Sequence, residues 1–131
     1  MSKTACIFVV DDDPAARKGL VRLLGAASYK VREFASANEF LDAFGPDDLG
    51  CIILDVRMPG LTGDELQSEL KARNVKLPII IVTADDTDET RRIAQRMKAA
   101  GFFRKPVDGM ALLDAIEWAL WSDKNDNDQS R

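Results

Sequence analysis

The stretch CIFVVDDD at residues 6–13 decides the fold, because a continuous apolar run ends there abruptly on three acids. A second run, CIIL at residues 51–54, ends in the same way on Asp55. Short apolar runs of this kind are typical of strands buried on both faces of a parallel sheet. If the two strands lie side by side, their acids meet at the carboxyl-end edge, where open α/β sheets bind their ligands. Clustered carboxylates repel one another and are costly to desolvate, so the pattern indicates a bound divalent metal.

Strand-like and helix-like segments alternate along the rest of the chain, with connections short enough for repeated βαβ units. The alternation predicts an α/β fold with a parallel sheet. The segment at 30–34 mixes polar and apolar residues, as an edge strand with one wetter face does. We expect strands at residues 6–10, 30–34, 51–54, 79–82 and 102–104.

Helix starts are indicated by acids or hydroxyl residues that precede apolar stripes. A further helix is expected to begin at the acid-rich segment 85–89, because the basic residues at 91–98 follow these acids in the order that a helix dipole favours. The predicted caps are Asp13 before Pro14, Ser36 with Glu39, Thr62 with Glu65, and Asp108.

The size of the chain allows one domain with one core. It has 131 residues, of which 46% are hydrophobic, and we expect the domain to comprise residues 1–121. Residues 122–131 carry no large apolar side chain. We expect them to form a polar, disordered tail, because they cannot bury enough surface to offset the entropy of ordering.

The charge balance bears on the partners. There are 18 basic and 22 acidic residues, and a net charge of -4 is the wrong sign for phosphate contacts, so we expect no direct nucleic-acid partner. No apolar stretch approaches the roughly 20 residues that cross a bilayer, and we expect neither secretion nor membrane contact. Cys6 and Cys51 lack CxxC spacing, which fits buried free thiols in a reducing cytoplasm.

The predicted strand ends bring polar side chains to one edge of the sheet. Asp11, Asp12 and Asp55 offer the hard oxygen ligands that Mg²⁺ prefers. Thr83 offers a hydrogen bond and Lys105 a positive charge, and both suit a phosphoryl group. In-line phosphoryl transfer needs an aligned nucleophile and cations that neutralise the equatorial oxygens. The residues therefore predict a phosphoryl site.

Four blocks of residues occur in order along the chain: Val10-Asp11-Asp12, LDVRMPGLTG at residues 54–63, Val82-Thr83-Ala84, and Phe103-Arg104-Lys105-Pro106. Together they closely resemble the receiver domain of two-component response regulators, and the resemblance covers residues 7–120. It implies a doubly wound, five-stranded parallel sheet of the flavodoxin-like (βα)5 type, with strand order 2-1-3-4-5 and helices on both faces. It also implies a cis peptide bond between Lys105 and Pro106.

The resemblance implies that Asp55 is the phosphoacceptor. Its phosphoryl group would come from a phosphohistidine on a sensor histidine kinase or a phosphotransfer protein. Lys105 would pair with one phosphoryl oxygen, and the Thr83 hydroxyl would hydrogen-bond to another. The chain would then be a signalling switch rather than an enzyme, one that catalyses only its own phosphorylation and dephosphorylation.

The resemblance also implies a set of metal ligands. Asp12 would bind Mg²⁺, or Mn²⁺, directly, and Asp11 would support it largely through water. Asp55 and the backbone carbonyl of Arg57 would be the remaining protein ligands. Asp13 departs from that role and is expected to cap the first helix. The Arg57 side chain is expected to screen the phosphoryl group from water.

A switch is implied as well. Thr83 and Phe102 match the hydroxyl and aromatic pair with which receivers couple the site to a surface, since moving Thr83 opens space into which the ring can turn. That surface is the fourth helix, fifth strand and fifth helix, and it would bind a downstream protein or a second copy. Trp118 and Trp121 are expected on or beside it.

Two other classes of protein stay open on the sequence. A haloacid-dehalogenase-like phosphatase would use Asp11 as nucleophile and Asp13 as general acid, but Pro14 and the lack of a late acidic pair count against it. A phosphorylation-independent adaptor would share the fold without the chemistry. The complete set of acids and lysine counts against that class. Treatment with a small-molecule phosphodonor separates the three classes. Modification of Asp55 would indicate a receiver, turnover through Asp11 a phosphatase, and neither an adaptor.

Overall fold

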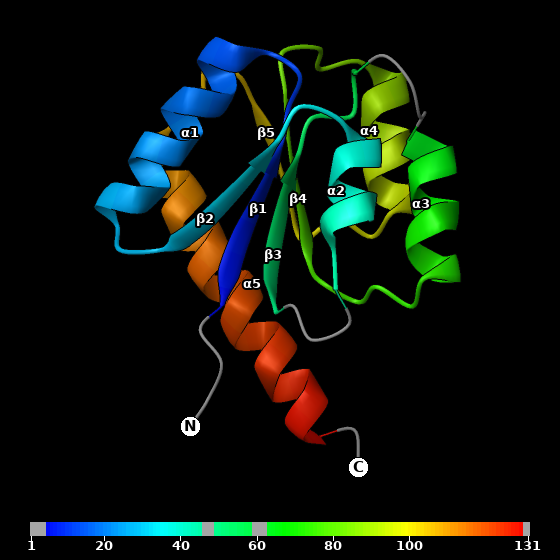
Figure 1. The fold of residues 1–131 in the computed structure, drawn as a ribbon. Coiled ribbons are helices and arrows are strands. Elements are labelled where there is room, and N and C mark those ends of the chain that lie inside the picture. The colour runs from blue at the N-terminus through cyan, green and yellow to red at the C-terminus, as the bar shows by residue number, and fades with distance from the viewer. Residues whose placement is uncertain (1–4, 46–48, 59–62, 130–131) are drawn as a thin grey trace.

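The computed structural model describes residues 5–45, 49–58 and 63–129, and there the sheet has five parallel strands in the order β2-β1-β3-β4-β5 (Figure 1). Strand order and parallel pairing agree with the prediction. Every predicted strand is present, and three of them are one residue longer than predicted. The strands are β1 (Cys6–Val10), β2 (Lys30–Phe34), β3 (Gly50–Leu54), β4 (Ile79–Thr83) and β5 (Gly101–Arg104).

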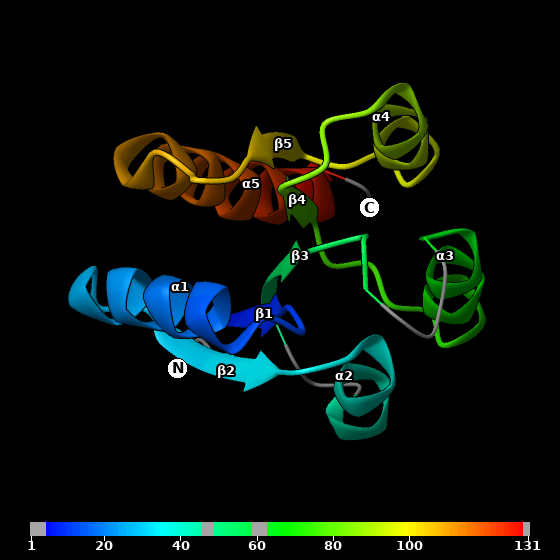
Figure 2. The ribbon, with the colours of Figure 1, turned by 90° about the horizontal axis from the view of Figure 1, so that it is seen from above.

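Helices cover both faces of the sheet. Seen from above, α1 and α5 lie on one face, and α2, α3 and α4 lie on the other (Figure 2). This is the doubly wound arrangement that the resemblance implied. The helices are α1 (Pro14–Ala26), α2 (Ala37–Ala43), α3 (Gly63–Ala72), α4 (Asp88–Arg96) and α5 (Gly109–Gln129).

The core forms two apolar layers, one on each face of the sheet. Because successive side chains of a strand point to opposite faces, Ile7 packs in the layer beneath α1 and α5, and Phe8 packs in the other. All residues of β1, β3 and β4 are buried. In β2 only Phe34 is buried, as expected of an edge strand. Burial on both faces explains why the central strands are continuous apolar runs.

Three of the predicted caps are observed. Ala15 N donates to Asp13 Oδ1 at 3.0 Å, Glu39 N donates to Ser36 Oγ at 3.1 Å, and Met110 N donates to Asp108 Oδ1 at 3.0 Å. The Glu39 carboxylate accepts from Ala35 N at 3.4 Å, one residue before the cap, so the Ser36 box is offset. The Thr62 cap lies outside the described residues.

The start of α4 agrees with the expected order of charges, and its cap is formed by two threonines. Thr87 is the N-cap, and Thr87 and Thr90 form a reciprocal capping box. Thr90 N donates to Thr87 Oγ1 at 3.2 Å, and Thr87 N donates to Thr90 Oγ1 at 3.0 Å. Asp88 and Glu89 occupy the first turn, where they favour the positive end of the helix dipole.

Helix α5 extends further than expected. The sequence predicts a disordered tail from residue 122, whereas α5 continues to Gln129. Once a helix is nucleated, each added residue gains a backbone hydrogen bond without any need for apolar burial. A polar segment can therefore continue a helix that its apolar part has started.

Two features bear on the predicted environment of the chain. Cys6 and Cys51 are both buried, as the sequence predicts, and neither forms a disulfide. None of the helices in the described part of the chain is long and apolar enough to cross a membrane.

Candidate functional site

The predicted acids meet at the carboxyl-end edge of the sheet. β1 pairs with β3 so that Val10 lies beside Leu54, and Asp55 N donates to the Val10 carbonyl at 3.0 Å. Asp11 and Asp55 therefore leave neighbouring strands at the same level. Carboxylate oxygens of Asp11, Asp12 and Asp55 all lie within 4.8 Å of one another. The parallel register alone gives this proximity, because both acids directly follow their strands.

Lys105 lies between two of these acids. Its Nζ donates to Asp11 Oδ2 at 2.6 Å and to Asp55 Oδ2 at 3.1 Å. Burial lowers the pKa of Lys105, but the hydrogen bonds to Asp11 and Asp55 outweigh it, so the pKa is raised overall. The ammonium group therefore stays charged between the two carboxylates.

The second oxygens of the same acids bind backbone amides. Asp13 N donates to Asp11 Oδ1, and Arg57 N donates to Asp55 Oδ1, each at 2.9 Å. Asp11 is 2% exposed and Asp55 is 8% exposed, whereas Asp12 is exposed. Both oxygens of Asp11 and both oxygens of Asp55 thus accept from protein donors, while Asp12 faces solvent. Of the three acids, Asp12 is therefore the one whose carboxylate is most open to a cation from solution.

The charges of the site do not cancel. Three carboxylates, Asp11, Asp12 and Asp55, stand against one ammonium, and at neutral pH their formal sum is −2. The donors are hard oxygens, which suit Mg²⁺ or Mn²⁺ and not a soft metal. A divalent cation would neutralise the remaining charge, so the donor set fits the predicted metal.

Thr83 ends β4 at the same edge and is fully buried. Its backbone carbonyl accepts from Lys105 N at 2.8 Å. Its hydroxyl accepts a hydrogen bond from Asp85 N at 3.1 Å, so it holds the loop between β4 and α4. Any group that draws the hydroxyl toward Asp55 must disturb this bond.

Arg57 links the two loops that border the site. Its Nε donates to Asp85 Oδ2 at 2.7 Å, and its guanidinium lies 3.5 Å from a carboxylate oxygen of Glu89. The pairs join the segment after β3 to the start of α4. The Arg57 side chain is thus held by two acids of the β4–α4 region, and Pro59 to Thr62 lie outside the described residues.

Phe102 lies on β5, opposite Ile81 of β4. It is half-buried, and the Arg91 guanidinium lies 5.0 Å from the centre of its ring. Arg91 is held in turn by a two-pronged pair with Asp86 at 2.6 and 2.8 Å. Arg91 of α4 thus makes a cation–π contact with the ring. Lys105-Pro106 is a cis peptide bond, as the resemblance implied.

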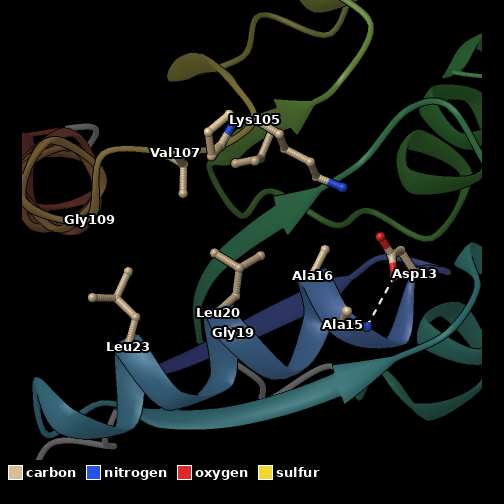
Figure 3. Close-up of a pocket in the computed structure, with 11 residues that line it drawn as sticks. Asp13, Ala15, Ala16, Gly19, Leu20, Leu23, Lys105, Val107 and Gly109 are labelled. Carbon is tan, nitrogen blue, oxygen red and sulfur yellow. Dashed lines mark hydrogen bonds between the residues drawn. The ribbon is translucent and has the colours of Figure 1, made fainter.

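Sequence reasoning overlooked two features next to the site. Arg17 Nη1 donates to the Asp11 carbonyl at 2.8 Å and its Nε to Glu33 at 2.9 Å, which ties α1 and β2 to the acidic loop. A hollow of about 670 Å³ runs between α1 and the segment after β5, with Leu20, Leu23 and Val107 along it and Lys105 at one end (Figure 3). The apolar spacing in α1 predicts that these leucines face the core, and it does not indicate that a hollow lies beside them.

A doubly wound sheet with three acids and a lysine at its carboxyl edge is the arrangement found in one large class of signalling proteins. A family model described as the response regulator receiver domain matches residues 7–117. The chain belongs to this family of two-component response regulators.

Curated relatives agree with the family. The transcriptional regulatory protein FixJ of Azorhizobium caulinodans is 39% identical over 120 residues, which are 92% of this chain and 57% of that protein. Nodulation protein W of Bradyrhizobium diazoefficiens is 36% identical over 130 residues, 99% of this chain and 57% of that protein. The transcriptional regulatory protein TdiR of Thauera aromatica is 42% identical over 87% of this chain and 50% of that protein. The chain thus spans about half the length of the curated relatives it matches.

Solved structures share the fold. The response regulator StyR has a TM-score of 0.85 and 41% identity, covering 96% of this chain and 64% of that one. FixJ-N has a TM-score of 0.79 and 31% identity, and the match covers 90% of this chain and 94% of that one. Two of the curated relatives are named transcriptional regulators, which contrasts with the expectation of no nucleic-acid partner. That expectation came from the net charge of these 131 residues.

Proposed function

We propose that Asp55 accepts a phosphoryl group from a phosphohistidine on a sensor histidine kinase or a phosphotransfer protein, in the cytoplasm. The observation that carries the proposal is the bridge from Lys105 Nζ to both Asp11 and Asp55. A cation fixed against an oxygen of Asp55 is where an incoming phosphoryl group needs its charge neutralised. Asp11 holds that cation in place, so little reorganisation is needed when the phosphoryl group arrives.

Asp55 is the only residue of the chain that forms a covalent bond during the transfer. One carboxylate oxygen of Asp55 forms a bond to phosphorus while the phosphorus–nitrogen bond of the donor breaks, and the imidazole keeps the electron pair. Lys105 then pairs with one phosphoryl oxygen. The Thr83 hydroxyl donates its hydrogen to another, and movement of its oxygen toward Asp55 would stretch the bond that it accepts from Asp85 N.

The same residues would hold the metal. Asp12, Asp55 and the backbone carbonyl of Arg57 would bind Mg²⁺ or Mn²⁺, with Asp11 supporting the ion through water. When bound, the ion would neutralise charge on the phosphoryl oxygens. The formal charge of −2 in the unliganded site supports this part of the proposal.

Movement of Thr83 would carry the signal to α4, β5 and α5. Thr83 would release the loop that leads into α4. The Phe102 ring on the adjacent strand would then turn into the space that Thr83 leaves. The result is a shift between two packings and not a new fold. The changed face would then bind a downstream protein or a second copy of the chain.

The test is to expose the chain to a small-molecule acyl phosphate with Mg²⁺ and to map the modified residue by mass spectrometry. We expect one added phosphoryl group on Asp55, with none on an Asp55→Asn variant. Asp13→Asn is the matched control, because asparagine caps a helix as well as aspartate and Asp13 is not a proposed ligand. The control is expected to be modified like the unaltered chain.

Other outcomes would overturn the proposal. Steady release of phosphate that depends on Asp11 and not on Asp55 would indicate a phosphatase. A chain that stays unmodified, although folded, would be a phosphorylation-independent adaptor.

A further inference from the structure

The two tryptophans of the chain form an exposed pair on α5 that the proposed chemistry does not use. Trp118 is 62% exposed and Trp121 is 56% exposed. Their rings stack with centres 5.1 Å apart and planes inclined by 27°. Large aromatic rings exposed side by side are uncommon on a surface that only meets water, and they are enriched where partners bind.

Two carboxylates flank the pair. Asp114 and Glu117 lie one turn before the tryptophans, and the four side chains line a hollow of about 280 Å³, which we call the indole patch. Residues at these spacings share one face of a helix. No ion pair joins Asp114 or Glu117 to a basic side chain within residues 5–45, 49–58 and 65–122. The patch therefore combines electron-rich indole rings with two carboxylates.

We propose that the indole patch binds an arginine side chain presented by a partner protein. A guanidinium group is planar, stacks on indole rings and forms forked hydrogen bonds to carboxylates, so it matches both components of the patch. Lysine would satisfy the charge but not the stacking. The patch extends over about 10 Å of helix, a length that suits one or two side chains of a peptide segment. The inference does not rest on phosphoryl transfer to Asp55.

The charge of the patch argues against the other occupants. A second copy placed on it by a two-fold axis would bring Asp114 and Glu117 against their own counterparts. The net charge of -4 adds to that repulsion. An anionic lipid surface would be repelled for the same reason. Only a cationic partner gains from every side chain that lines the hollow.

Intrinsic fluorescence tests the proposal directly, because both tryptophans of the chain lie in the patch. The unphosphorylated chain is titrated with a capped, alanine-based helical peptide that carries arginines one turn apart. A matched peptide carries citrulline, which keeps the shape but loses the charge. We expect a saturable emission change with the arginine peptide and binding weaker by at least about tenfold with the citrulline peptide.

Variants locate the binding site, with affinity measured by calorimetry. We expect two variants to weaken arginine-peptide binding by about tenfold each. The first is Trp118→Ala, and the second combines Asp114→Asn with Glu117→Gln. Met110→Ala is the matched control, since Met110 is 70% exposed on the same helix but does not line the hollow. It is expected to bind like the unaltered chain.

Three results would overturn the proposal. Equal binding of both peptides would show that charge is not recognised. A concentration-dependent dimer that Trp118→Ala abolishes would identify a second copy as the occupant. An emission change with phosphatidylglycerol vesicles and none with the arginine peptide would identify lipid. Because the chain stays unphosphorylated throughout, failure here leaves the proposed phosphoryl transfer untouched.

Discussion

Lys105 gives the site its charge balance at the scale of a single residue. Breaking a buried pair by removing one partner leaves unpaired charge, and Lys105→Met is expected to lower the free energy of unfolding by about 3 kcal/mol near neutral pH. The loss reflects the two carboxylates that remain together without a cation. Urea unfolding without added metal measures it. A variant as stable as the unaltered chain would mean that the pair contributes nothing.

Lys105 also predicts how stability depends on pH. Its pKa in the folded chain is raised above the ordinary value of 10.5, so its contribution is complete below that value and is lost as the pH rises through the folded pKa. The pKa of Tyr29 is raised from 10.0, first by burial and then by Glu117, and its contribution is lost in the same direction. Stability is therefore expected to fall above about pH 10.

Variants separate the two contributions to this alkaline loss. Lys105→Met and Tyr29→Phe are each expected to make stability fall less steeply with pH, and the double variant least steeply. Urea unfolding at a series of pH values measures the slopes. A Lys105→Met slope equal to that of the unaltered chain would contradict the assigned linkage.

Gly50 has a backbone that only glycine adopts with ease. Its φ is 145°, and an added Cβ would lie 1.7 Å from the carbonyl oxygen of Cys6, which is backbone and cannot turn away. Gly50→Ala is expected to destabilise the fold by about 3 kcal/mol or more. Gly19→Ala is the control, because nothing lies within 4 Å of its Cβ and alanine favours the helix, so a small gain is expected. Thermal unfolding of both variants tests the contrast.

At the scale of elements, Arg91 couples α4 to β5. Its guanidinium covers the Phe102 ring, and such contacts at exposed sites are worth about 0.5–1 kcal/mol. Arg91→Ala is expected to free the ring and to shift the balance of packings by about two- to fivefold. Aromatic NMR of labelled phenylalanine measures the ring, and the rate of Asp55 phosphorylation measures the consequence, which is expected to rise.

Arg92→Ala is the matched control, because Arg92 is an exposed arginine on the same helix with no contact to Phe102. It is expected to leave both the ring signals and the rate unchanged. A shift of equal size in both variants would assign the effect to the loss of a positive charge and not to the contact.

The elements show what the sequence could and could not predict. Burial on both faces makes β1, β3 and β4 continuous apolar runs, so their positions could be read to within one residue. The charges indicated where α4 begins, but its threonine cap was not predicted, because Thr90 stands where a capping box usually has Glu or Gln. The extension of α5 was missed because helix propagation needs no apolar pattern. The sequence therefore predicts the elements whose positions are fixed by an apolar pattern, and it does not predict those that lack one.

The site shows the same limit at a longer range. Each acid could be assigned to the edge because it directly follows a predicted strand. The link from Lys105 to Asp11 could not be predicted from the residues alone, since it joins positions 94 residues apart through the register of four strands. The stacking of Trp118 on Trp121 depends on rotamers that spacing does not fix.

The whole molecule should respond to metal through its stability, because the acidic edge joins β1 and β3 at the centre of the sheet. An ion that binds only the folded chain, present at 100 times its dissociation constant, adds about 2.7 kcal/mol to the free energy of unfolding. We expect Mg²⁺ to raise the melting temperature. Asp12→Asn is expected to remove most of that rise and, by relieving repulsion, to be slightly more stable than the unaltered chain without metal.

Asp13→Asn separates metal binding from a mere loss of charge. It removes one negative charge from the same loop, and asparagine keeps the cap of α1, so the variant is expected to retain the rise with Mg²⁺. Calorimetric melting with and without Mg²⁺, at constant ionic strength, compares the three chains. If both variants lost the rise equally, the ion would be responding to the overall field of the edge, and Asp12 would have no special place in the site.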